Sequence, residues 1–127
     1  MSAQSQDDVV AESDGVVHQA LRREVNERIS SINITFGVAP PETMDVVCEC
    51  IWNDCTAKIT MIVGDYEAVR RFPTRFFVKE GHEVAEGERV VAEADGYVVI
   101  EAYGREGIYA IEADPRRRKL RSAEASA

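Results

Sequence analysis

The pattern of apolar and polar positions predicts one long helix near the start of the chain. Apolar residues recur at steps of four and three between residues 16 and 32, with charged residues between them. This apolar stripe consists of Val17, Leu21, Val25, Ile29 and Ile32. Such a helix either packs its stripe on its own domain or docks it on a partner or a second copy. Gly37 and the Pro40–Pro41 pair then predict an extended linker over residues 33–44.

After the linker, the pattern changes to short elements. Residues 44–47 and 57–63 predict two strands on either side of a polar, turn-prone segment, so this region reads as a hairpin. Residues 64–72 predict a short helix that ends before Pro73, with Asp65 as its N-terminal cap and Arg70 favouring its C-terminal end.

The C-terminal half predicts further strands. Residues 75–79 form a β-rich run, and residues 86–95 predict a short helix that Gly96 breaks. Residues 97–103 and 108–113 are β-rich, and the two glycines of "GREG" between them predict a hairpin. The fold class is therefore α+β: a small, mostly antiparallel sheet with an N-terminal amphipathic helix, a hairpin near the middle and one or two short helices.

Length and composition predict one soluble domain with an unstructured tail at each end. At 127 residues, 45% hydrophobic and 30% charged, the chain can bury a core of its own. We expect a disordered acidic tail over residues 1–15, a single α+β zinc-binding domain over residues 16–113 and a flexible basic tail over residues 114–127. The net charge of −8 argues against general binding to nucleic acid or to anionic membranes.

The first residues carry neither a basic segment nor an apolar core typical of a signal peptide, and no apolar run is long enough to span a membrane. We therefore expect a cytoplasmic protein. Thiols stay reduced there, and closely spaced cysteines in such a compartment indicate metal or redox chemistry more often than a structural disulfide.

The candidate chemistry lies in the hairpin, where all three cysteines fall within eight positions. Cys48, Cys50 and Cys55 form the pattern C-x-C-x4-C. Structural zinc takes four thiolate or imidazole ligands in a tetrahedron, and a hairpin tip lets closely spaced thiolates share one ion. His82 lies in a turn at the end of a separate predicted strand, whereas His18 lies at a helix start. The spacing thus predicts a zinc-knuckle-like hairpin whose structural Zn²⁺ is held by Cys48, Cys50, Cys55 and His82.

Two other interpretations of the cysteines stay open. Three close thiols could serve as a redox or disulfide device, or they could pack as small apolar side chains. Glu49 and Asp54 lie beside them, and nearby acids raise thiol pKa values, which makes cysteines poor nucleophiles. A divalent cation reverses this effect because it deprotonates the thiols and tolerates the acids, so the acidic setting favours the metal site.

Three stretches resemble a family of small, uncharacterised proteins common in actinobacteria and their relatives. They are "VCECIWNDC", "YEAVRRFPTRFFVKEGHE" and "GYVVIEAYG", within residues 20–113, and the family pattern is F-x-C-E-C-x4-C, E-Y-E-x-V-R, R-F-x-V-x-x-G-H-E, Y-x-V-V-E. The matched positions include Cys48, Cys50, Cys55, Tyr66, Arg70, Phe76, Gly81, His82 and Glu83. Val47 replaces a common aromatic residue, and Asp65 a common glutamate. The resemblance implies a Cys3His site and implies no activity.

Candidate catalytic residues do not form a recognisable set. The chain lacks a Ser/His/Asp pattern and a phosphate-binding glycine loop. We therefore hypothesise a non-enzymatic, zinc-stabilised interaction or regulatory module, which acts on a larger cytoplasmic protein through helix 16–32 or its charged tails. The alternatives are a zinc–thiolate redox sensor, or a small zinc enzyme with Glu49 or Glu83 as acid/base.

Overall fold

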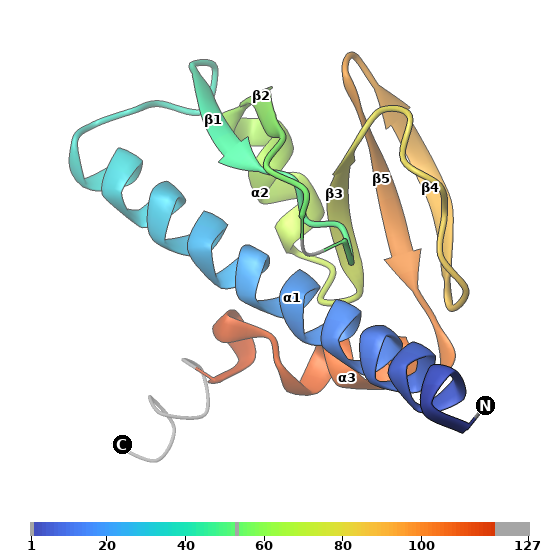
Figure 1. The fold of residues 1–127 in the computed structure, drawn as a ribbon. Helices are drawn as coiled ribbons and strands as arrows, with labels where there is room; N and C mark the ends of the chain where they lie inside the picture. The colour runs from blue at the N-terminus through green and yellow to red at the C-terminus, as the bar shows by residue number, and fades with distance from the viewer. Residues whose placement is uncertain (1, 53, 119–127) are drawn as a thin grey trace.

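A computed structural model describes residues 2–52 and 54–118 of the chain (Figure 1). Along the sequence the elements are α1 (Ser2–Thr35), β1 (Thr43–Val47), β2 (Lys58–Ile62), α2 (Val63–Arg70), β3 (Arg75–Lys79), β4 (Glu88–Ala94), β5 (Tyr97–Ala102) and α3 (Gly104–Glu112). The predicted α+β class, with its long N-terminal helix and antiparallel strands, is confirmed. None of the helices in the described residues is long and apolar enough to cross a membrane.

Two antiparallel sheets meet at the segment that carries the first cysteines. Strands β1 and β2 form the predicted hairpin, with Val47 opposite Lys58. Strand β5 lies between β3 and β4 in the second sheet. Beyond β1, the amide of Glu49 donates a hydrogen bond to the carbonyl oxygen of Phe77 in β3, at 2.7 Å. The chain after β1 therefore joins the hairpin to the second sheet.

The apolar core lies where α2 packs against the strands. Tyr66 of α2 stacks on Phe77 with ring centroids 5.3 Å apart, and Phe77 meets Tyr97 edge-on at 5.9 Å. Phe76 and Ile100 of the same sheet are also fully buried. Helix α2 and strand β3 form as the sequence predicted, although Asp65 makes no side-chain cap.

The second half of the chain corrects two predictions. Residues 86–95 contain strand β4, not a helix, and the tight hairpin lies between β4 and β5, where Ala94 pairs with Tyr97 across Asp95 and Gly96. Gly96, the second residue of this two-residue turn, has a positive φ of 86°, which glycine adopts without strain. The "GREG" segment instead opens helix α3. Gly107 packs there against the backbone of β5, where an added Cβ would lie 2.9 Å from the carbonyl oxygen of Ala102.

Helix α1 differs from its prediction in extent and in orientation. Residues 2–15, predicted to be disordered, form its first turns, because this segment contains no proline and nothing in it ends a helix. The helix also packs on the domain through its polar face, whose buried members are Gln19, Arg23, Asn26, Glu27 and Ser30. The predicted apolar stripe points the other way, with Leu21 51% and Ile32 56% exposed.

The C-terminal segment is attached as far as the structure describes it. Residues 115–118 form a helical turn, and the guanidinium of Arg116 donates hydrogen bonds to Glu27 of α1 at 3.1 Å and to Glu67 of α2 at 3.0 Å. Arg118 pairs with Glu24. These bases thus find acidic partners on α1 and α2, and the flexibility of residues 114–127 stays a prediction. Residues 119–127 lie outside the described residues.

Candidate metal centre

The three cysteines lie on the Cys loop, residues 48–57, which connects β1 to β2. The backbone shapes this loop from both sides. The amide of Cys48 donates to the carbonyl oxygen of Ala57 at 3.0 Å, which extends the β1–β2 pairing to the start of the loop. The amide of Cys55 donates to the carbonyl oxygen of Trp52 at 3.2 Å, which turns the chain back. The hairpin therefore brings its two ends together and presents all three thiols on one side.

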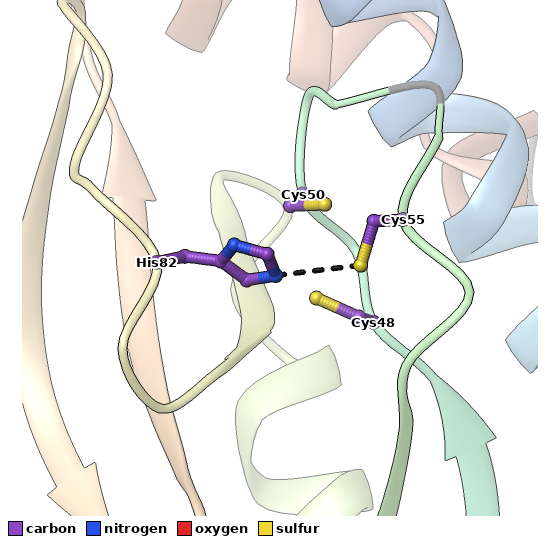
Figure 2. A group of neighbouring side chains, drawn as sticks. All are labelled: Cys48, Cys50, Cys55 and His82. Atoms are coloured by element: carbon purple, nitrogen blue, oxygen red, sulfur yellow. Dashed lines mark hydrogen bonds between the residues drawn. The ribbon is translucent and has the colours of Figure 1, made fainter.

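His82 completes a cluster of four metal-binding side chains (Figure 2). Figure 2 shows the three sulfur atoms and the imidazole ring pointing toward one another from the Cys loop and from the turn after β3. All four ligand atoms lie within 4.8 Å of one another, and the Cys55 sulfur is 3.3 Å from His82 Nε2. A tetrahedral zinc site with Zn–S bonds of about 2.3 Å needs sulfur atoms about 3.8 Å apart. The four residues thus lie close enough to hold a metal ion.

The turn after β3 places the imidazole. Gly81 has a φ of +97°, a conformation that residues with a side chain rarely adopt, and the chain reverses there directly before His82. The amide of Lys79, at the end of β3, donates a hydrogen bond to the sulfur of Cys48 at 3.2 Å. A backbone donor of this kind stabilises a thiolate that binds metal. Strand β3 therefore supports the site at both Cys48 and His82.

Arg22 of α1 is the nearest cation, and the sequence prediction missed it. Its guanidinium donates to the sulfur of Cys50 at 3.0 Å and to the carbonyl oxygens of Cys50 and Cys55 at 2.9 and 3.0 Å. One side chain thus clamps both arms of the Cys loop and places a positive charge beside a ligand sulfur. In the sequence, Arg22 looked like an ordinary member of a solvated charged face.

The thiols influence one another strongly. A hydrogen bond from the Cys48 thiol lowers the pKa of Cys50 to about 5; hydrogen bonds involving Trp52 and Cys55 and the charge of Arg22 act in the same direction against burial. The same hydrogen bond, followed by burial, raises the pKa of Cys48. The protein alone therefore favours one thiolate and resists forming a second beside it. A divalent cation supplies the charge that a set of thiolates needs.

Glu49 lies between two of the cysteines but faces away from them. Its buried carboxylate accepts two hydrogen bonds from the guanidinium of Arg70, at 2.6 and 2.9 Å, and one from the amide of Phe77 at 3.0 Å. Although burial alone would lower it, the Glu49 carboxylate raises the pKa of Arg70. These internal hydrogen bonds argue against the hypothesis that Glu49 is a catalytic acid/base. Arg70 was predicted only to favour a helix end.

Asn26 connects α1 to the same segment. Its carboxamide pairs with the backbone of Val47 through two hydrogen bonds, at 2.8 and 2.9 Å, in the way that a neighbouring strand would. It also donates to the Glu49 carboxylate at 2.8 Å. Gln19, about two helical turns earlier, donates to the carbonyl oxygen of Glu49 at 3.1 Å. The inner face of α1 thus fixes the backbone at the start of the Cys loop through hydrogen bonds.

The structure brings together the four residues that the sequence proposed as ligands, and His18 is not among the cluster. It adds Arg22, Asn26 and Arg70 as residues that position the cluster. Only Arg70 carried a signal, because it belongs to the family pattern quoted above. Comparison with family models, with curated proteins and with solved structures finds no match to this chain. The geometry of the site therefore carries the functional argument.

Proposed function

We propose that Cys48, Cys50, Cys55 and His82 bind a structural Zn²⁺ ion that fastens the Cys loop to the turn after β3. The observation that carries this proposal is the convergence of the four ligand atoms within 4.8 Å. Three sulfurs and one imidazole nitrogen are a donor set that zinc takes in closed structural sites. Two segments about thirty residues apart in sequence would then be joined through one ion.

Charge around the cluster supports zinc. Three thiolates and a neutral imidazole bring a charge of −3 to a +2 ion, which leaves −1 in a half-buried site. The guanidinium of Arg22, 3.0 Å from the Cys50 sulfur, offsets this residual charge. The buried acid of the loop, Glu49, is already neutralised by Arg70 and adds no net charge.

The site supports an interaction module better than an enzyme. Four protein ligands fill a tetrahedron and leave no position for a substrate. The Cys loop in turn holds the inner face of α1 through Arg22, Gln19 and Asn26. Zinc would thus fix the position of α1, whose outer apolar stripe is the candidate docking surface for a protein partner. We infer a zinc-stabilised regulatory or interaction protein; the charge of −8 disfavours nucleic acid as the target.

Hydrogen exchange with and without zinc tests this chain of contacts. Removal of zinc with a chelator is expected to lower the protection of the Cys loop and of residues 16–32, while the amides of β5, which lie in the apolar core, keep theirs. Readdition of zinc should restore the pattern. Unchanged exchange in α1 after verified zinc loss would show that the ion does not organise this helix.

The redox-sensor alternative predicts a different result when the same hydrogen-exchange experiment is done with peroxide. Peroxide would oxidise the thiols, release zinc and produce the same loss of protection as the chelator, and a thiol reductant would reverse it. A closed structural site resists this treatment because its thiolates are engaged and two of the three cysteines are buried. We therefore expect zinc retention under peroxide concentrations that oxidise free cysteine.

A further inference from the structure

The outer face of α1 presents most of the apolar stripe to solvent. Val17, Leu21, Val25 and Ile32 are 41%, 51%, 46% and 56% exposed, and Ile29 is half-buried. The exposed Arg28 lies among them, one turn after Val25 and one turn before Ile32. The polar residues that hold α1 on the domain lie on the opposite side of the same helix. Within residues 2–52 and 54–118, no element covers this stripe, and Figure 1 shows α1 along one side of the molecule. An amphipathic helix that turns its apolar face outward marks an interface.

We propose that the stripe is the interface of a homodimer in which the α1 helices of two copies pack antiparallel. From Val17 to Ile32 the stripe is about 22 Å long at about 1.5 Å per residue. Phe36, which is 82% exposed, lies one turn beyond it. Several layers of side chains can interdigitate over this length. The contact is at the small end of specific interfaces, so the dimer is expected to be reversible.

Charge selects a second copy in the antiparallel direction. Arg28 lies within the stripe and Glu24 lies beside it, two residues after and two residues before Asn26. Glu24 also pairs with Arg118 of its own chain. A two-fold axis at the level of Asn26 therefore places each Arg28 opposite Glu24 of the second copy. A parallel pair would instead oppose like charges. The stripe carries no net charge, so the overall charge of −8 is not concentrated at the contact.

A groove lies on the surface where the antiparallel arrangement would place Leu21 of the second copy. It has a volume of about 620 Å³ between α1 and the turn 115–118, and it is lined by Glu24, Glu27, Arg28, Ser31, Ile32, Pro115 and Arg118. Ser31 lies as far beyond Asn26 as Leu21 lies before it. In the antiparallel pair, Leu21 of the second copy therefore reaches the level of this groove, where Ile32 and Pro115 are the residues that offer it apolar contacts.

Sedimentation velocity over a range of concentrations tests the dimer, with the zinc-loaded full chain. Wild type is expected to shift from monomer to dimer as concentration rises. Leu21→Glu should weaken association at least about tenfold, because the change removes a buried leucine from each copy. The matched control is Ile108→Glu, an equally exposed change on α3 (61% exposed), which should leave association unchanged. A monomer up to on the order of 100 µM would overturn the proposal.

Charge variants test the direction of the pair. Arg28→Glu and Glu24→Arg should each weaken self-association, and an equal mixture of the two should recover it as a heterodimer. A parallel pair would not show this pattern, since each single change would only exchange one like-charge contact for another. Failure of the mixture to recover association would overturn the antiparallel arrangement.

This inference rests on the proposed function, because the zinc-bound Cys loop holds α1 in place. Zinc content and circular dichroism, measured on the same fractions, distinguish failure of the dimer proposal from failure of the proposed function. Folded monomer with a full complement of zinc would overturn the dimer alone and leave a different protein as the occupant of the stripe. Folded dimer without zinc would overturn the proposed function and leave the dimer standing.

Discussion

The two sides of this molecule are held together by different forces. On the sheet side, α2 and strands β3 and β5 enclose an apolar core, in which Tyr66 and Phe77 stack and Ile100 is fully buried. On the α1 side, the helix meets the Cys loop through buried polar groups, among them Gln19 and Asn26, which both bond to Glu49. The first side is stabilised mainly by nonpolar burial. The second side depends on the geometry of its hydrogen bonds.

The difference gives the candidate metal site a structural role on the second side. Buried polar groups depend on their hydrogen-bond partners. The two terminal nitrogens of Arg23 donate to the carbonyl oxygens of Pro73 and Ala110, at 2.6 and 2.8 Å, whereas its Nε has no partner among the described residues. Burial lowers the pKa of Arg23. A loop that must present carbonyl oxygens to α1 needs a rigid shape, which four ligands on one ion provide. Predictions on each side can separate these two modes of stabilisation.

The largest effect is expected at the buried ion pair beneath the Cys loop. Glu49→Gln leaves the Arg70 guanidinium buried without a counter-charge, which should lower the free energy of unfolding by about 3–5 kcal/mol. Urea unfolding of the zinc-loaded protein measures this loss. The matched control is Glu101→Gln, whose pairs with Arg75 and Arg89 lie at the surface and should matter by about 0–1 kcal/mol. Equal losses in the two variants would contradict the distinction.

A smaller effect is expected where α1 imitates a strand. Asn26→Ala leaves the backbone amide and carbonyl of Val47 without their partners, so stability should fall by about 1–3 kcal/mol. The change should also speed hydrogen exchange at the start of the Cys loop. Val25→Ala, the neighbouring position on the outer face, is the control and should change monomer stability little. If both variants unfolded at the same urea concentration, the hydrogen bonds between Asn26 and Val47 would not be what stabilises the contact of α1 with the domain.

Replacement of Arg22, which bonds to both arms of the Cys loop, should lower zinc affinity more than it lowers the stability of the fold. Arg22→Met keeps much of the aliphatic packing but removes three hydrogen bonds and the charge beside Cys50. Residues that support metal ligands typically change affinity by about 10–100-fold, and we expect the lower end of that range. Competition with a colorimetric chelator measures it. Arg28→Met, on the outer face of α1, should retain wild-type zinc affinity when measured at monomer concentrations.

The smallest effect belongs to the sheet side and sharpens the comparison. Ile100→Val removes one methylene from the core and should cost about 0.5–1.5 kcal/mol in urea unfolding. Zinc affinity should remain unchanged, because Ile100 lies in the apolar core and makes no hydrogen bond to the Cys loop. A variant that lost zinc affinity in proportion to stability would show that the two sides behave as a single unit.

Local sequence patterns predicted those parts of the structure that local chemistry determines. The β1–β2 hairpin, helix α2, strand β3 and the four candidate ligands follow from apolar alternation, turn residues and ligand spacing. The β-rich residues 108–112 are instead part of helix α3, in which Gly107 packs closely on β5, a tertiary contact that propensity does not contain. The Asp-Gly pair at residues 95 and 96 indicates a turn between two strands. The sequence prediction missed it because it placed residues 86–95 in a helix.

The orientation of α1 could not be read from periodicity. An amphipathic pattern identifies two faces, and burial of the apolar one is only the commoner outcome. Here the inner face is polar because its partners are backbone carbonyls of the Cys loop and the buried carboxylate of Glu49. The complementary position of Arg70 is likewise a long-range match between two segments, and spacing along the chain does not encode it.

Elemental analysis tests the central claim most directly. Native protein purified without chelator is predicted to contain one zinc per chain, His82→Ala to bind zinc much more weakly, and His18→Ala, which changes the other histidine, to bind it as wild type does. Cobalt substituted into wild type should give the absorption of a tetrahedral thiolate site. Folded native protein that contains no metal and binds none when zinc is added, or His82→Ala with undiminished affinity, would contradict the account.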